Sequence, residues 1–140
     1  MTEADPCPEI CVVIPAKDEV AAIGGLVAEI VAALEGESFA ITVVDDGSSD
    51  GTGAQLELLA RRHPQLGWLR HDVALGQSAA IRSGVRAARA PVIVTLDGDG
   101  QNPPAQIPLL LAALRAPGAA GVGLVHQNPG RYTMPQVLGL

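Results

Sequence analysis

The stretch PVIVTLDGDGQ, residues 91–101, is a short run of apolar, mostly β-branched residues followed at once by an acidic turn. Such an uninterrupted run is typical of a strand that is buried on both faces of a parallel sheet. Two earlier stretches repeat the pattern: ICVVI at residues 10–14 runs into PAKDE, and ITVV at residues 41–44 runs into DDGSSDG. Because ligands of open α/β sheets bind beyond the carboxyl ends of the strands, these three polar clusters mark the predicted site.

Helical periodicity fills the segments between these strands. One helix face is formed by apolar residues at the i, i+3, i+4, i+7, i+8 and i+11 spacing: Ile23, Leu26, Val27, Ile30, Val31 and Leu34. The sequence also predicts helices from about Thr52, over residues 77–89, and from Pro103 or Pro104 with Asn102 as cap, and weaker strands at 67–71 and 121–125. This alternation predicts an α/β fold, a doubly wound, mostly parallel sheet with helices on both faces.

Composition and charge restrict the class of protein. The chain has 140 residues, 48% of them hydrophobic, and a net charge of −6. These values predict one globular domain and disfavour a nucleic-acid partner, because the acidic excess repels phosphate backbones. We assign the domain to residues 10–125, between an N-terminal tail (1–9) and an irregular C-terminal tail (126–140). The N-terminus lacks the features of a secretory signal, so we expect a cytoplasmic protein whose Cys7 and Cys11 are reduced thiols.

Several common site motifs are excluded by single residues. A calcium loop starting at Asp97 would have Asn102 in place of its glycine and Pro108 in place of its glutamate. Residues 15–20 lack the glycines of a dinucleotide-binding turn, and the chain has neither a GxxxxGK[ST] loop nor a GxSxG elbow. Hydride transfer, P-loop ATP hydrolysis and serine hydrolysis are therefore disfavoured.

The DGD turn after the last of the three strands is a candidate metal site. Asp97 and Asp99 can direct two carboxylates into one crevice, which is unfavourable unless a cation neutralises them. Magnesium takes oxygen ligands of this kind and completes its shell with water and phosphate oxygens, so the pair favours a substrate that bears a diphosphate. Gln101 can add a neutral oxygen. The alternative is a hydrated acidic turn without a ligand.

The second polar cluster also has two interpretations. Ser48, Ser49 and Asp50 are favoured as turn and helix-cap residues ahead of Thr52. Asp46 differs, because a carboxylate at a strand tip can accept hydrogen bonds from a nucleobase edge or from ribose hydroxyls. On the predicted helix at 77–89, three arginines at i, i+4 and i+7 indicate a solvated face, and Arg82, the one nearest the helix start, is the candidate for contact with a phosphate.

Taken in order, the strings CVVIPAKDE, VVDDGSSDGT and GQSAAIRSGVRAARAPVIVTLDGDGQNPP resemble the family 2 glycosyltransferases with a GT-A fold, and most closely their polyprenyl-phosphate sugar transferases. The resemblance covers about residues 10–115. It implies transfer of a sugar, with inversion, from a GDP- or UDP-sugar to an acceptor such as a polyprenyl phosphate at the inner face of the membrane. No nucleic acid takes part.

The resemblance also implies roles for individual residues. Pro15, Ala16 and Glu19 would line the nucleotide pocket, and Asp46 would hold the base. Asp97 and Gly98 would contact the donor. Asp99, Gln101 and Asp97 would hold Mg²⁺ or Mn²⁺ on the diphosphate, so that Asp18, Glu19, Asp46, Asp97 and Asp99 crowd one crevice.

The sequence departs from the family on the carboxyl side, where relatives continue into an acceptor-binding half that often carries the general base. We therefore expect a chain that is cut short, with its general base outside these residues. Two alternatives stay open. One is a non-catalytic nucleotide-sugar-binding fragment of such an enzyme. The other, less favoured, is a nucleotidyltransferase, because residues 15–20 lack the glycine-rich, arginine-bearing loop of those enzymes.

Overall fold

The fold is a parallel five-stranded sheet in the order β3-β2-β1-β4-β5. The computed structural model describes residues 7–116 and 136–139. The strands are β1 Ile10–Ala16, β2 Phe39–Asp46, β3 Leu66–His71, β4 Val92–Thr95 and β5 Gln136–Gly139. The helices are α1 Val20–Ala33, α2 Thr52–Arg62, α3 Gln77–Ala87 and α4 Ile107–Arg115, the last preceded by a 3₁₀ turn, η1, at Pro104–Gln106. The predicted α/β class is confirmed.

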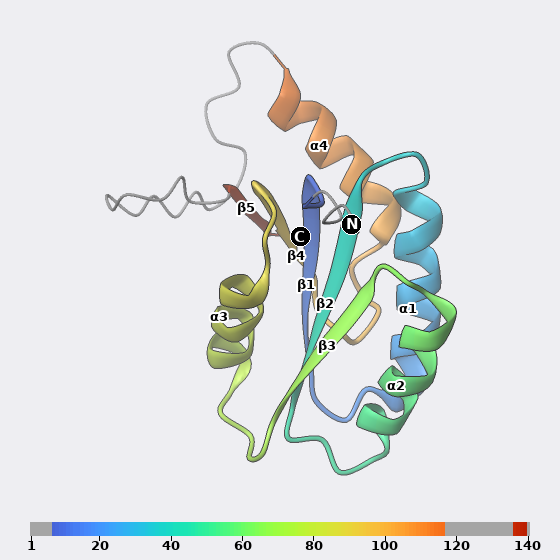
Figure 1. The fold of residues 1–140 in the computed structure, drawn as a ribbon, viewed down its shortest axis with the longest axis vertical. Helices are drawn as coiled ribbons and strands as arrows, with labels where there is room; N and C mark the ends of the chain where they lie inside the picture. The colour runs from blue at the N-terminus through green and yellow to red at the C-terminus, as the bar shows by residue number, and fades with distance from the viewer. Residues whose placement is uncertain (1–6, 117–135, 140) are drawn as a thin grey trace, which may run out of the picture.

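Helices cover both faces of the sheet because the strands are apolar on both sides. In β1, Ile10, Val12 and Ile14 pack into a core shared with α1, α2 and α4, whereas Cys11 and Val13 belong to a smaller core beneath α3. Figure 1 shows α3 on one face of the sheet and α1 and α2 on the other. Every residue of β1 is buried, which explains its continuous hydrophobic sequence.

The strand order reverses between β1 and β4, which pair in register from Ile10 opposite Val92 to Val13 opposite Thr95. The chain proceeds outward from β1 through β2 to β3, and then returns through α3 to the other side of β1. The carboxyl ends of β1 and β4 therefore open a crevice at this switch point, as the polar clusters of the sequence predicted.

Two local expectations differ from the structure. Gln136–Gly139 lies within the stretch expected to be irregular, yet it pairs with β4 as strand β5. Four residues are too few to show a period, so this strand is defined by its partner and not by its sequence. Asn102 does not cap the following helix, because Pro103 takes the cap position of η1 and makes no side-chain cap hydrogen bond. The predicted strand at 121–125 lies outside the described residues.

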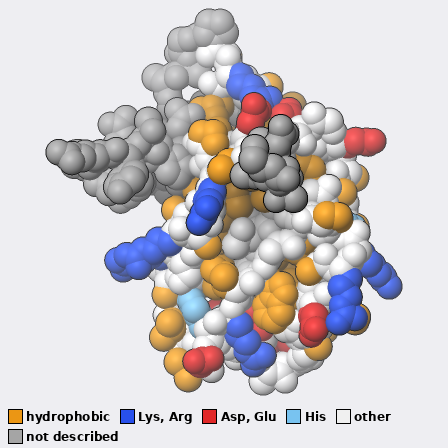
Figure 2. Space-filling model, in the orientation of Figure 1, with side chains coloured by type: hydrophobic (Ala, Val, Ile, Leu, Met, Phe, Trp, Pro, Cys, Tyr) orange, Lys and Arg blue, Asp and Glu red, His pale blue; other side chains and the backbone are white. Residues whose placement is uncertain are grey.

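Charged side chains are dispersed over the surface. On the face drawn in Figure 2, Lys and Arg side chains alternate with Asp and Glu and form no large patch of one sign. Both predicted thiols are free cysteines, Cys7 exposed and Cys11 buried. Within the described residues, none of the helices combines the length and the hydrophobicity that a membrane span requires.

Candidate functional site

An open cavity of about 450 Å³ lies beyond the carboxyl ends of β1, β2 and β4. This volume lies within the range of small-ligand pockets. The lining residues come from the three predicted polar clusters and from the start of α3: Pro15, Ala16, Lys17, Glu19, Asp46, Ala74, Gly76, Gln77, Ala80, Asp97, Gly98 and Asp99. The structure thus brings together the seven residues assigned above to the nucleotide sugar. Gln101 and Arg82 are exposed and are not lining residues.

Gly98 allows the β4 loop to lie directly against the end of β1. A Cβ atom at this position would stand 2.9 Å from the carbonyl oxygen of Pro15 and 3.3 Å from the Cβ of Ala16. Because the first of these neighbours is backbone, a side chain at position 98 would force the two strand ends apart. Glycine therefore keeps the carboxylates of the DGD turn next to Pro15 and Ala16.

Each carboxylate of the DGD turn is oriented by a hydrogen bond to one of its two oxygens. Asp97 Oδ1 accepts a hydrogen bond from Gln77 Nε2 at 2.8 Å, and Asp99 Oδ1 accepts one from the Gln101 backbone N–H at 3.0 Å. The Oδ2 atoms of both residues accept no hydrogen bond from the described part of the chain. Two oriented carboxylates thus keep oxygen atoms available at the cavity.

Negative charge accumulates between the β1 loop and the DGD turn. Burial raises the pKa of Glu19, and the carboxylates of Asp99, Asp50 and Asp18 raise it further. Asp18, expected in the crevice, is not a lining residue; its Oδ1 accepts the Ser49 N–H at 2.9 Å. The Glu19 carboxylate therefore lies in a predominantly negative environment.

The loop after β2 holds the β1 loop in place through side-chain hydrogen bonds. Ser48 Oγ accepts the Asp18 N–H at 2.8 Å, and Asp50 Oδ2 accepts the Val20 N–H at 3.1 Å. Asp50 Oδ1 accepts the Thr52 N–H at 3.0 Å, at the start of α2. These contacts agree with the turn roles expected for Ser48 and Asp50, but the expected cap role is wrong, because the N-cap residue of α2 is Gly51 and no side chain caps the helix.

The donor set of the cavity fits a hard divalent cation. Asp97, Asp99 and Glu19 offer carboxylate oxygens, and Lys17 is the single lysine or arginine among the described lining residues. Among the residues that the structure describes, no three His, Cys, Asp or Glu side chains form a ready cluster for a metal. The protein can therefore supply part of a coordination shell, which suits a cation that keeps water and phosphate oxygens as ligands.

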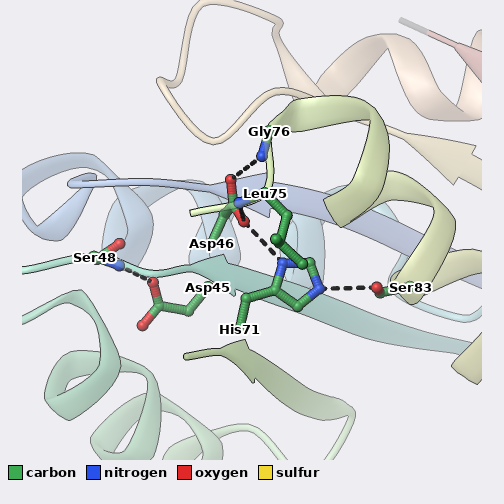
Figure 3. A network of polar contacts seen from close by, with 7 residues as sticks. All are labelled: Asp45, Asp46, Ser48, His71, Leu75, Gly76 and Ser83. Atoms are coloured by element: carbon green, nitrogen blue, oxygen red, sulfur yellow. Dashed lines mark hydrogen bonds and ion pairs between the residues drawn. The ribbon is translucent and has the colours of Figure 1, made fainter. Parts of the chain in front are cut away.

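Asp46 and its neighbour Asp45 point to opposite faces of β2, as successive strand residues must (Figure 3). Asp46 is 4% exposed and accepts hydrogen bonds from the backbone N–H groups of Leu75 and Gly76 and from the His71 ring. Burial alone raises the pKa of Asp46, but these hydrogen bonds together lower it below its ordinary value. The carboxylate is thus anchored in its charged form.

The sequence analysis did not predict Gln77 or His71 as parts of this site. Gln77 is the first residue of α3, and its contact with Asp97 spans 20 positions. His71 meets Asp46 across 25 positions. The parallel register of β2 and β3 places Asp46 opposite His71, and this register is not readable from a single sequence.

Fold and site together define a doubly wound α/β domain with a carboxylate-lined crevice at its switch point, the architecture of GT-A glycosyltransferases. The family model described as glycosyl transferase family 2 matches residues 11–138. The chain belongs to this family, which confirms the resemblance identified from the sequence.

Several relatives are undecaprenyl-phosphate sugar transferases by name. The chain is 36% identical over 136 residues to the undecaprenyl-phosphate 4-deoxy-4-formamido-L-arabinose transferase of Salmonella enteritidis PT4. It is 37% identical over 136 residues to the transferase of the same name from an Enterobacter species. In both alignments 91% of this chain is covered, and the chain spans 40% of the relative's length.

Solved structures share the fold at lower identity. A mannosyltransferase from Pyrobaculum calidifontis, in complex with GDP-Man and Mn²⁺, matches 68% of this chain and 28% of its own at a TM-score of 0.60 and 23% identity. TarS from S. aureus, in complex with UDP-GlcNAc, matches 65% of this chain and 26% of its own at a TM-score of 0.58 and 21% identity.

Proposed function

We propose that the cavity binds a nucleotide-diphosphate sugar together with a divalent cation, and that the chain forms the donor-binding part of a family 2 glycosyltransferase. The observation that carries this proposal is the convergence of the PAKDE, DDGSSDG and DGDGQ segments on one cavity. The sugar-nucleotide complexes of two structures with the same fold support it. The proposal includes both GDP and UDP as the nucleotide of the donor.

In this proposal Asp99 and Asp97 hold Mg²⁺ or Mn²⁺, with Gln101 next to Asp99 on the same turn. The cation would neutralise negative charge on the leaving nucleoside diphosphate. Pro15, Ala16, Glu19 and Gly98 line the nucleotide and donor part of the cavity, and Asp46 faces the base. The N-terminus of α3 adds support, since its N-cap residue Gly76 and its residues Gln77 and Ala80 line the cavity and place the positive end of the helix there.

We further propose a polyprenyl phosphate as acceptor, because the relatives named above are undecaprenyl-phosphate transferases. A phosphate oxygen is already ionised near neutral pH, so its attack requires little help from a general base. Such attack on the sugar from the face opposite the diphosphate inverts the anomeric carbon. The reaction would take place at the membrane surface, where the lipid carrier resides.

Calorimetric titration with GDP-mannose and with UDP-GlcNAc, each with and without Mn²⁺, tests donor binding. We expect binding by at least one donor that depends on the metal and falls by at least about tenfold in Asp99→Asn, because the variant loses a charged oxygen ligand. Glu57→Gln is the matched control, since it makes the same change on the exposed side of α2. Equal binding by wild type and Asp99→Asn would contradict the proposal.

A second assay separates an enzyme from a binding fragment. Radiolabelled donor is incubated with undecaprenyl phosphate, and transfer and donor hydrolysis are measured separately. Sugar transfer with inverted anomeric configuration supports the complete proposal. Donor binding without transfer or hydrolysis would restrict the function of this chain to binding the nucleotide sugar.

A further inference from the structure

We propose that His71 is a positioning residue for the donor site, acting through Asp46 on the loop at residues 74–76 and on the start of α3. This inference rests on the proposed function, because it assigns a purpose to contacts that surround the proposed donor cavity. Neither His71 nor its second partner, Ser83, lines that cavity. The effect of His71 on a ligand must therefore pass through other residues.

Three elements contribute to the arrangement drawn in Figure 3. His71 ends β3, Asp46 ends β2 and Ser83 lies in α3. His71 Nδ1 is 2.8 Å from Asp46 Oδ1, and His71 Nε2 is 2.8 Å from Ser83 Oγ. An ionised carboxylate can only accept hydrogen bonds, so Nδ1 is protonated and donates a hydrogen bond to Asp46. When the ring is neutral, the Ser83 hydroxyl donates a hydrogen bond to Nε2.

The same three residue types form the catalytic triad of serine hydrolases, but the surroundings here assign a different role. A nucleophilic serine needs a cavity in which a substrate carbonyl can reach its Oγ atom. Ser83 instead lies within α3, one residue before the buried Gly84 that packs against Val13 and Val44, and it is not a lining residue of the cavity. The contacts with His71 therefore orient Asp46 and α3.

Asp46 transmits this orientation to the wall of the cavity. Its Oδ1 accepts the Leu75 N–H at 2.8 Å in addition to His71, and its Oδ2 accepts the Gly76 N–H at 2.9 Å. Gly76, at φ +100°, is the N-cap residue of α3 and lines the cavity, and the next residue, Gln77, donates to Asp97. A continuous chain of hydrogen bonds and backbone thus joins His71 to a carboxylate of the proposed metal site.

The arrangement also leaves Asp46 able to bind a ligand. A carboxylate oxygen has two lone pairs, and Oδ1 uses both, one for His71 and one for Leu75. Oδ2 accepts one hydrogen bond within the described residues, from Gly76, so it keeps a lone pair for an N–H or O–H donor of the base or ribose. His71 therefore determines which oxygen of Asp46 is available.

Two substitutions at position 71 separate the two contacts. Asn places an amide nitrogen near the site of Nδ1, so His71→Asn keeps the hydrogen bond to Asp46 and loses the hydrogen bond with Ser83. Gln places its amide nitrogen near the site of Nε2, so His71→Gln keeps a polar group facing Ser83 and loses the hydrogen bond to Asp46. We expect the Mn²⁺-dependent affinity for UDP or GDP to fall about tenfold or more in His71→Gln, and by less than about threefold in His71→Asn.

Amide hydrogen exchange of Leu75 and Gly76 in the free protein provides a readout that does not need a ligand. We expect both amides to lose protection in His71→Gln and to keep it in His71→Asn. Equal behaviour of the two variants in exchange and affinity would overturn the inference. If the wild type binds no nucleotide, the proposed function fails, while hydrogen exchange still decides the role of His71.

Should His71→Gln not fold, Ser83→Ala is expected to leave the Leu75 and Gly76 amides protected, and loss of that protection would contradict the inference.

Discussion

The pKa of Glu19 shows that negative charge is concentrated around this part of the cavity. Burial and three neighbouring carboxylates raise the pKa of its side chain, so the charged form is less favourable in the folded chain than in the unfolded one. Above the ordinary value of 4.5, ionised Glu19 therefore opposes folding. A bound cation would reverse this effect.

We predict that Glu19→Gln raises the melting temperature of the metal-free chain by about 1–3 °C near pH 7. The gain should shrink toward zero as the pH falls below 4.5, because Glu19 is then neutral in both states. Thermal unfolding at several pH values measures the effect. A gain that does not depend on pH would contradict the electrostatic explanation.

At the residue scale, the sequence predicted the side chains that follow strands and missed those that meet across strands. Asp97, Asp99 and Glu19 each stand directly after a buried run, and parallel strands direct such positions to one edge of the sheet. His71 and Gln77 enter the site through contacts with residues 25 and 20 positions away. No local pattern encodes those distances.

At the element scale, α3 depends on one glycine for its close approach to the sheet. A Cβ atom at Gly84 would overlap Val13 Cγ1 and would stand 3.2 Å from Val44 Cγ2. Both valines belong to central strands that are buried on both faces, so they have little room to shift. The position of α3 sets the position of Gly76 and Gln77 at the cavity.

Gly84→Ala is predicted to destabilise the chain by about 1–2 kcal/mol, because overpacking exceeds the gain in helix propensity. Urea unfolding measures the change. The matched control is Gly25→Ala in α1, where a Cβ would meet no atom within 4 Å. That substitution should stabilise by about 0.5–1 kcal/mol. Stabilisation by both alanines would show that α3 does not pack as closely as described.

Helices of several turns and strands with a continuous run of buried residues were predicted from the sequence. Short elements that depend on pairing with a neighbouring strand or on local proline geometry were not. The spacing of Ile23, Leu26, Val27 and Ile30 identified α1, and these four side chains are buried in the structure. Strand β5 has four residues and exists through its pairing with β4. The 3₁₀ turn η1 replaced the expected cap at Asn102, because prolines at 103 and 104 fix the local backbone.

At the scale of the whole molecule, the sheet order supports the proposal that this acidic chain binds an anionic donor. The net charge of −6 disfavours phosphate ligands in general, but β1 and β4 bring several of the acids to one crevice where a divalent cation can bridge them to a diphosphate. In the proposed function, these acidic side chains bind the cation. The same order places β2, with Asp46, on the other side of β1 from β4 and its DGD turn.

Locating the cation is the most direct test of the proposed donor site. An isotope-labelled chain is mixed with UDP or GDP and a small fraction of Mn²⁺, and paramagnetic broadening of backbone amide signals is compared with a Mg²⁺ control. We expect the amides of Ala16, Glu19, Gly76, Gly98 and Asp99 to broaden first, and Asp99→Asn to abolish this pattern. Broadening centred elsewhere, or the same pattern in Asp99→Asn, would contradict the proposed donor site.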